Sequence, residues 1–520
     1  MLATLLSATV NGLDGRVIRV EVDVAPGLPG FTIVGLADTA LLEARERVRG
    51  ALRNAGFVHP PRRITVNLAP ADMRKAGASL DLAIAVGILL GSEQLRPGPL
   101  RPALVGELSL GGEVRHVPGL LPMARALARR GVRQLVVAAE GAAEASLVAG
   151  LQVYGVETLA EAVGLVRARP RRGFAAVLPR IQLPASPLGQ DLGTGPSAAD
   201  RVDLAEVRGQ LEARRALEVA LAGGHALLMI GPPGSGKTLL ARTIPGLLPP
   251  LGDEEALEAT IVASVAGGGP VTRLVRSAPF RAPHHTASYA AMVGGGPRLS
   301  PGEVTLANDG CLFLDELPEF SRDVLEALRQ PIEEGRVEVA RVGRATVFPA
   351  RFQLVAAMNP CPCGQAGTGS GLCACRPGVP ERYLGRISGP LRDRIDIWVQ
   401  MPRVPAAALV AAGEPEGSAV VAARIAAARE RQLGRPPGRL NARVSGRALR
   451  AACRLTPAAE ARLVALADRE RLSGRGTERL LRVARTIADL AGAEAVESAH
   501  LDEAARFRSP IGSAHAALAV

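Results

Sequence analysis

The chain has 520 residues, of which 48% are hydrophobic and 22% charged, so it is long enough for two to four domains and has a globular composition. Its 62 Lys and Arg against 50 Asp and Glu give a net charge of +12, which suits an anionic partner such as nucleic acid but also fits a genome biased towards arginine. The opening residues lack a signal-peptide pattern and no apolar run reaches the ~18 residues of a membrane helix, so we expect a cytoplasmic protein with no membrane partner.

The first 170 residues alternate between strand-like and helix-like segments, which predicts an α/β domain over residues 1–170. Strands are predicted at residues 16–24, 31–36, 62–69 and 134–139. Helices are predicted at residues 41–56, 79–91, 123–131 and 157–166. A Gly-Gly pair within residues 103–115 predicts a hairpin between these elements.

The remaining chain divides by composition into three segments. Residues 171–199 are rich in Pro, Gly and Ser and lack periodicity, which predicts a linker. Residues 200–405 again alternate between apolar strands and helices and predict a second α/β domain. Residues 406–510 are rich in Ala and Arg, with helical apolar spacing at 461–472 and 479–492, and predict a helical domain.

A glycine-rich loop, GPPGSGKT at residues 231–238, lies between an apolar strand at 224–230 and a helix at 239–248. This strand–loop–helix context is the one that a phosphate-binding loop requires, because its glycines let backbone N–H groups turn towards phosphate oxygens. Lys237 is one of only two lysines in the chain, although arginine is abundant. A compact ammonium can reach the β- and γ-phosphates inside a tight loop, whereas the wide guanidinium of arginine does not fit there.

A second apolar strand begins at Cys311, which we expect to be buried. This strand ends at Asp315 and Glu316, about 80 residues after the loop. Asp315 is a predicted Mg²⁺ ligand together with Thr238, and Glu316 is the predicted base for the attacking water. A third apolar strand, at 352–358, ends at Asn359, whose amide can contact that water. The predicted ATP- and Mg²⁺-binding residues are Gly231, Pro232, Pro233, Gly234, Ser235, Gly236, Lys237, Thr238 and Asp315.

Four of the six cysteines cluster in CPCGQAGTGSGLCAC, as Cys361, Cys363, Cys373 and Cys375. Two pairs of thiolates separated by a flexible loop can form a tetrahedral zinc site. The C-x-C spacing is tighter than the usual C-x₂-C, so free or redox-active thiols are the alternative.

The order of these motifs resembles AAA+ ATPases of the magnesium-chelatase-like group, and most closely the YifB/ComM family. The resemblance covers nearly the whole chain and is carried by RAPHHTAS, GEVTLANDGCLFLDELPEF, FPARFQLVAAMNPCPCG, RISGPLRDRID and RVARTIADLAG. It implies an AAA+ P-loop core with a C-terminal helical lid, in a homo-oligomeric ring, a hexamer, with ATP between subunits. It would make Asn359 the sensor-1 residue and Arg394 the arginine finger. Arg475 would be the sensor-2 residue, with Arg479 as the alternative.

The segment KAGASLDLAIAVG resembles the surroundings of the catalytic serine in Lon-type proteases, with Ser79 at the serine position. The first domain would therefore have a Lon-protease-like, S5-type fold. A Ser–Lys dyad needs a lysine downstream, but Leu121 occupies the matching position and no lysine lies between Lys75 and Lys237. We expect this domain to be proteolytically inactive, with Ser79 as a helix cap.

Two insertions, at residues 292–305 and 337–349, are expected around the ATPase core. The second is predicted to be a hairpin that carries Arg341 and Arg344 near its turn. In related AAA+ helicases such hairpins line the pore and contact DNA phosphates, and an exposed surface hairpin is the alternative.

The family resemblance implies an ATP-driven helicase or branch-migration motor that acts on single-stranded or branched DNA. A chelatase-type motor subunit that remodels a partner protein is the alternative, although such motors resemble only the ATPase part. A non-enzymatic scaffold does not explain the complete set of ATPase motifs.

Overall fold

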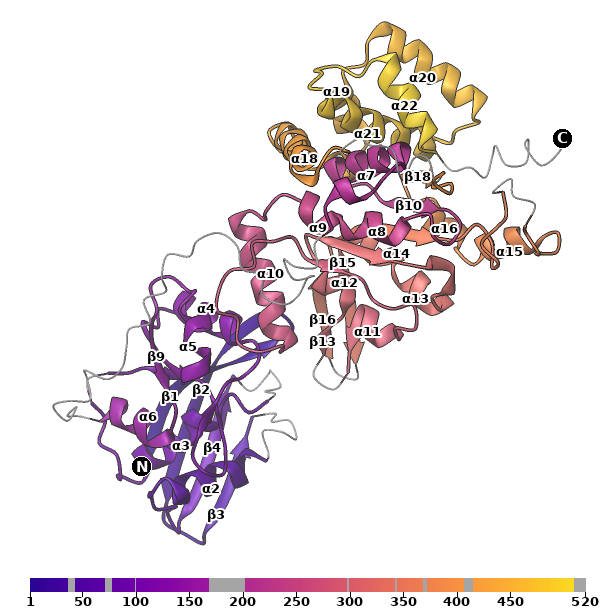
Figure 1. Cartoon of the computed structure of the whole chain (residues 1–520). Coiled ribbons are helices and arrows are strands. Elements are labelled where there is room, and N and C mark those ends of the chain that lie inside the picture. Colours follow the sequence, from indigo (N-terminus) through magenta and orange to yellow (C-terminus); the bar gives the residue numbers. More distant parts are fainter. Residues whose placement is uncertain are drawn as a thin grey trace.

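The computed structural model describes residues 1–35, 43–70, 77–98, 100–167, 202–296, 299–341, 344–367, 372–405 and 415–508. The predicted linker at residues 171–199 lies outside these ranges, as does Lys75. Figure 1 shows three parts in succession: an indigo-to-purple N-terminal part, a magenta-to-orange central part and a yellow helical C-terminal part. Among the described helices, none combines the length and the apolar character needed to cross a membrane.

The N-terminal part contains a four-stranded sheet in the order β1 (Leu2–Asn11), β2 (Asp14–Ala25), β4 (Arg63–Ala69) and β3 (Gly30–Val34). β3 and β4 are parallel, and the other pairs are antiparallel. Along β2, alternate residues from Ile18 to Val24 are buried, because successive side chains of a strand point to opposite faces. Helices α2 (Ala44–Asn54) and α3 (Asp81–Gly91) contribute to the same hydrophobic core.

A smaller parallel sheet completes the N-terminal part, in the order β5 (Ala103–Leu104), β8 (Gln134–Ala138) and β9 (Gln152–Val156). The predicted hairpin is present as β6 (Glu107–Leu108) and β7 (Val114–Arg115). The helices of this region are α4 (Leu120–Arg129), α5 (Ala142–Ala145) and α6 (Leu159–Val166).

The predicted strands and helices of this part are present, but the sequence analysis missed β1, β9 and the short helix α5. The expectation that Ser79 caps α3 is wrong. Leu80 precedes the helix, and the Ser79 hydroxyl instead donates to the carbonyl oxygen of Ala8 in β1 at 3.0 Å. The residue at the N-cap position is therefore Leu80, whose apolar side chain cannot accept a hydrogen bond from the first turn.

The central part is built on a five-stranded parallel sheet in the order β11 (Phe280–Arg281), β14 (Cys311–Leu314), β17 (Gln353–Met358), β10 (Leu227–Ile230) and β18 (Ile397–Gln400). Every residue of β10, β14 and β17 is buried, which explains why these strands are continuous apolar runs in the sequence. The carboxyl ends of parallel strands meet at one edge, so the residues after β10, β14 and β17 lie together.

Helices and two hairpins surround this sheet. The helices before β14 are α7 (Leu211–Gly223), α8 (Lys237–Arg242), α9 (Ile244–Leu247), α10 (Asp253–Ala266), α11 (Tyr289–Val293) and α12 (Glu303–Leu306). Those after it are α13 (Arg322–Ala327), α14 (Arg329–Glu334), α15 (Val379–Gly385) and α16 (Gly389–Arg392). The predicted insertions form hairpins of β12 (Gly294–Gly295) with β13 (Ser300–Pro301) and of β15 (Arg336–Arg341) with β16 (Arg344–Pro349).

The C-terminal part is helical, as predicted, and consists of α18 (Ser418–Leu433), α19 (Gly446–Cys453), α20 (Pro457–Arg469), α21 (Gly474–Leu490) and α22 (Ser498–Arg506). Its apolar faces share one hydrophobic core with α7 and one face of the central sheet. These helices pack against α7, which lies between them and the central sheet, rather than forming a separate unit (Figure 1).

The N-terminal and central parts meet at two places. The carboxylate of Glu144, which is fully buried on α5, accepts hydrogen bonds from the Ser264 hydroxyl at 2.6 Å and from the Val271 N–H at 3.1 Å. Ser264 belongs to α10, which lies beside α4 (Figure 1). At the second place, a methyl group on Gly12 would lie 2.3 Å from Thr346 Cγ2, so the turn between β1 and β2 packs directly on the β15–β16 hairpin.

Candidate functional site

The glycine-rich loop joins the end of β10 to α8 and is held against the two neighbouring strands. The N–H of Gly231 donates to the carbonyl oxygen of Met358, the last residue of β17, at 3.2 Å. A methyl group on Gly231 would lie 2.2 Å from the carbonyl oxygen of Met401, just beyond β18, so only glycine fits. Gly234 and Gly236 have φ values of +77° and +90°, the left-handed region that glycine adopts without strain.

Lys237 connects this loop to the end of β17. Its Nζ donates to the carbonyl oxygens of Gly231 at 2.7 Å and Pro232 at 3.0 Å, and to Asn359 Oδ1 at 3.2 Å. Burial of the side chain lowers the pKa of Lys237. The three donors of the ammonium thus converge on the loop and on Asn359, two positions that the sequence placed in separate motifs.

Thr238 and Asp315 lie side by side. The Thr238 hydroxyl donates to Asp315 Oδ2 at 2.7 Å, while Oδ1 of the same carboxylate accepts from the Glu316 N–H at 2.9 Å. A hydroxyl and a carboxylate are oxygen ligands suited to Mg²⁺. Glu316 has a φ of +53°, a strained value for a non-glycine residue, and this conformation accompanies a half-exposed carboxylate at the edge of the sheet.

His285 lies beside Glu316 and was missed by the sequence analysis. Its Nδ1 is 3.3 Å from Glu316 Oε2, and its ring packs edge-on against Phe320 with the centroids 6.5 Å apart. His284 lies against it, with ring centroids 4.1 Å apart. The His-His pair in RAPHHTAS follows β11, the strand next to β14, and this position is the signal that could have identified it.

Within the described residues, Arg394, Arg475 and Arg479 form no hydrogen bond or ion pair with the phosphate loop. Arg394 forms an ion pair with Glu333 of α14, and its pKa is lowered by burial and by the charges of Arg329 and Arg475. Arg479 donates to the carbonyl oxygen of Ile395 at 3.2 Å. Arg475 is exposed and forms neither a hydrogen bond nor an ion pair within the described part of the chain. The charge of Arg475 thus lies close enough to Arg394 to lower its pKa, whereas the guanidinium of Arg479 donates to a backbone carbonyl.

A buried polar network ties the helical part to the start of β10. The ring of His225 is fully buried, with Nδ1 3.1 Å from Asp396 Oδ2 and Nε2 2.8 Å from the Thr486 hydroxyl oxygen. The amide nitrogen of Asn441 donates to Thr486 at 3.0 Å and to Asp489 at 2.8 Å. The sequence analysis missed this network because its members lie hundreds of residues apart.

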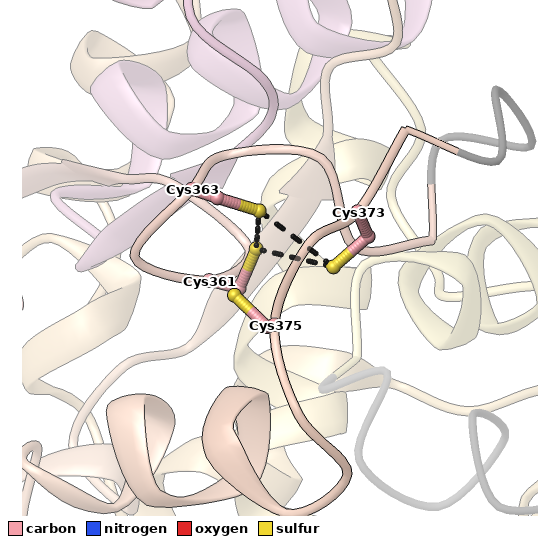
Figure 2. Close-up of side chains that lie close together, drawn as sticks. All are labelled: Cys361, Cys363, Cys373 and Cys375. Carbon is pink, nitrogen blue, oxygen red and sulfur yellow. Dashed lines mark hydrogen bonds between the residues drawn. The ribbon is translucent and has the colours of Figure 1, made fainter.

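The four clustered cysteines come together, as Figure 2 shows. The sulfur of Cys361 lies 3.3 Å from that of Cys363 and 3.9 Å from that of Cys373, and all four sulfurs are within 4.8 Å of one another. The N–H of Ala366 donates to Cys361 Sγ at 3.3 Å. The backbone N–H of Gln365, together with the side chains of Cys361 and Cys375, lowers the pKa of Cys363 to about 6. This arrangement has the ligand number and compactness of a tetrahedral thiolate metal site.

The other cysteines lie elsewhere. Cys311 is buried in β14, as predicted, and Cys453 is buried at the end of α19. Burial raises the pKa of both thiols. Neither thiol faces the four-cysteine cluster.

The remaining positions that the sequence singled out are Ser79 and Leu121 in the N-terminal part and Arg341 and Arg344 in the β15–β16 hairpin. Ser79 is only 4% exposed and Leu121 is fully buried, and the hydroxyl of Ser79 is bonded to the backbone. Arg341 is the last residue of β15 and Arg344 the first of β16, and the two pair on either side of the hairpin turn. Their side chains lie outside what the structure describes. The buried residues of this hairpin, Val337, Val339 and Phe348, anchor it to the central part.

A parallel sheet that presents a glycine-rich loop, an Asp-Glu pair and an Asn at one edge defines a mixed α/β protein of the phosphate-loop class. Three family descriptions match the chain: "Magnesium chelatase, subunit ChlI" over residues 203–409, "Subunit ChlI of Mg-chelatase" over 20–141 and "Magnesium chelatase, subunit ChlI C-terminal" over 415–508. The chain belongs to the YifB/ComM family of magnesium-chelatase-like proteins.

Full-length relatives support this assignment. The uncharacterized protein YifB of Salmonella typhimurium is 43% identical over 514 residues, which cover 98% of this chain and 97% of the relative. The competence protein ComM of Haemophilus influenzae is 42% identical over 513 residues, 98% of each chain. An uncharacterized protein of Mycobacterium tuberculosis is 46% identical over 499 residues, 94% of this chain and 95% of its own.

Proposed function

We propose that this chain is an ATP-hydrolysing ring motor that acts on DNA. The observation that carries the proposal is the convergence of Lys237, Thr238, Asp315 and Asn359 at the carboxyl edge of one parallel sheet. Lys237 binds the β- and γ-phosphates, Thr238 and Asp315 hold Mg²⁺, and Asn359 contacts the attacking water. Glu316 polarises that water from the strand end next to Asn359.

The strand order of the central sheet, with a helical part packed over it, supports an AAA+ core. Arg394 lies beside Arg475, and neither bonds to the phosphate loop within the described residues of its own chain. This placement supports the proposal that Arg394 acts as the arginine finger on the nucleotide of a neighbouring subunit, as in a hexameric ring. Arg475 is preferred over Arg479 as the sensor-2 residue, because Arg479 already donates to Ile395.

The DNA part of the proposal rests on the β15–β16 hairpin, the charge of the chain and the name of one relative. The hairpin places Arg341 opposite Arg344 at its turn, and the net charge is +12. One relative is named a competence protein. We propose single-stranded or branched DNA as the substrate, bound through its phosphates with little sequence preference.

The proposed cofactors are ATP with Mg²⁺ at the sheet edge and one zinc ion at the four cysteines. Zn²⁺ prefers four thiolate ligands in a closed tetrahedral shell, which the sulfurs within 4.8 Å of one another are able to supply. Free thiols would not require four residues from two segments of chain to converge. Elemental analysis of purified protein should find about one zinc per chain.

The DNA proposal is tested by ATPase rate against DNA concentration at two salt concentrations. Arg341→Ala with Arg344→Ala should remove DNA stimulation and flatten the salt dependence, because fewer phosphate contacts release fewer counterions. Arg336→Ala is the control, since it removes one positive charge at the base of the hairpin, away from the turn, where Arg336 pairs with Glu334. Identical curves for the double variant and the wild type would contradict the hairpin's role. Absence of stimulation in the wild type would favour a motor that remodels a protein partner.

The shared-site part is tested by mixing subunits. Arg394→Ala and Lys237→Ala subunits should each be inactive alone, because one lacks the finger and the other the phosphate-binding lysine. In mixed rings, some interfaces pair an intact loop with an intact finger and should recover part of the ATPase rate. Failure of every mixing ratio to recover activity would contradict an active site shared between subunits.

A further inference from the structure

The four-cysteine segment is a direct continuation of the proposed nucleotide site. Cys361 is only two residues beyond Asn359, whose amide oxygen accepts from Lys237 at 3.2 Å. We call the described residues 361–367 and 372–375 the cysteine knuckle. Only Pro360 separates Cys361 from Asn359, so a shift of Cys361 also shifts Asn359, which accepts from Lys237.

The cysteine knuckle also touches the phosphate loop from the other side. Gly364 forms a tight turn in which its N–H donates to the Cys361 carbonyl oxygen at 2.9 Å. A methyl group on Gly364 would lie 2.4 Å from Cδ and 2.8 Å from Cγ of Pro233 in the phosphate loop. The backbone of the knuckle and the ring of Pro233 are thus in close contact, at a point where no side chain fits.

These two contacts lie at the two ends of the Lys237 hydrogen-bond set. One end is the loop, where Gly231 and Pro232 accept from Lys237, and the other is Asn359. The knuckle is joined covalently to Asn359 and packs against Pro233, so it bridges both ends. A rigid knuckle keeps the distance between them constant.

We propose that the metal-loaded cysteine knuckle braces the phosphate loop against Asn359, so that zinc occupancy sets the nucleotide affinity of the site. A bound zinc cross-links the two described segments of the knuckle through their four thiolates. The brace keeps the loop preorganised and so removes an ordering cost from nucleotide binding. The inference rests on the proposed ATP site, which its test examines separately.

The experiment compares full-length wild type with three variants, each measured for zinc per chain, thermal melting and affinity for a fluorescent ATP analogue. Cys363→Ser with Cys375→Ser removes two ligands. Gly364→Ala keeps all four thiols but places a methyl group against Pro233. Gly367→Ala is the matched control, because Gly367 has a φ of +70°, close to the +77° of Gly364, but a methyl group there meets nothing within 4 Å.

The wild type should carry about one zinc per chain, and the double cysteine variant should lose it and bind nucleotide about tenfold more weakly. Gly364→Ala should retain zinc yet bind nucleotide about fivefold to tenfold more weakly than Gly367→Ala, since both share the backbone strain and only the first displaces Pro233. Zinc-free wild type, or equal affinity in the two glycine variants, would overturn the inference. The inference is also overturned if the double cysteine variant loses zinc and keeps the wild-type affinity for nucleotide.

Lys237→Ala separates this outcome from a failure of the proposed function. If wild type binds nucleotide and Lys237→Ala does not, the ATP site is correct, and the knuckle variants alone decide on the brace. If the wild type binds no nucleotide, the ATP site and the brace both fail. Should the double cysteine variant misfold, as seen in its melting curve, Gly364→Ala against Gly367→Ala still decides the question.

Discussion

Replacing Glu144 by Gln should weaken the contact between the N-terminal part and the central part. The buried carboxylate accepts from four donors. Oε1 accepts from the Leu121 N–H at 2.9 Å and the Ser264 hydroxyl at 2.6 Å, and Oε2 accepts from the Val271 N–H at 3.1 Å and lies 3.0 Å from His116 Nε2. Glutamine has the same shape but presents an NH₂ group in place of one oxygen.

The magnitude follows from this donor count. Whichever way the amide is turned, its NH₂ faces a backbone N–H, either that of Leu121 or that of Val271. If the NH₂ faces Val271, that buried N–H is left without an acceptor, and if it faces Leu121, that N–H keeps only a long hydrogen bond of 3.4 Å to the Ser264 hydroxyl. Either loss costs about 1–3 kcal/mol. The remaining hydrogen bonds also lose the added strength that a charged acceptor provides. We expect a total loss of about 2–4 kcal/mol, at the upper end of single-residue effects.

Urea unfolding monitored by fluorescence provides the assay, because Trp398 is the single tryptophan of the chain and is buried in β18 of the central sheet. With a urea dependence of about 3 kcal/mol per molar, the Glu144→Gln midpoint should fall by about 1 M. Glu140→Gln is the control, since Glu140 is exposed on the same segment and its replacement can still accept from the His116 N–H. Its midpoint should stay within about 0.2 M of wild type. A Glu144→Gln midpoint equal to that of the control would refute the view that this contact stabilises the core.

Further substitutions, at Glu316, Lys237, His285 and His284, probe the proposed nucleotide site. Glu316→Gln should bind ATP normally but release no phosphate, and a wild-type hydrolysis rate would remove Glu316 from its role. Lys237→Ala should weaken nucleotide binding by at least about tenfold, and Lys237→Arg should not restore it, as measured by nucleotide titration. His285→Ala should lower kcat by about tenfold with unchanged nucleotide affinity, because His285 lies against Glu316 and not against the phosphate loop, while His284→Ala should change kcat by less than about twofold.

The proposed nucleotide site could be assembled from the sequence because each of its pieces is a short contiguous motif. GPPGSGKT, the Asp-Glu pair and Asn359 each follow an apolar strand, and parallel strands bring their carboxyl ends to one edge. The cysteines were equally visible, since all four lie within residues 361–375. Local sequence therefore specifies both the ligands and the strand ends that carry them.

Other elements were missed for identifiable reasons. β1 was not predicted, although Asn11-Gly12 at its end is a strong hairpin signal, because its buried and exposed side chains do not alternate strictly. Ser79 was assigned to a helix cap because its position in the sequence suits one, whereas its actual partner, Ala8, is 71 residues away. His285 was quoted only as part of a motif, because its neighbour Glu316 lies on another strand.

The amino-acid sequence by itself determined the alternation of strands and helices, the residues of the phosphate loop and the membership of the YifB/ComM family. These features depend on periodicity and on contiguous residues, which local physical chemistry governs. Only the tertiary structure decided that Lys237 bonds to Asn359, that Gly364 packs on Pro233, and that Glu144 joins the N-terminal part to the core. Such contacts depend on how distant strands and helices pack in three dimensions, and no pattern along the chain encodes the distance between two particular atoms.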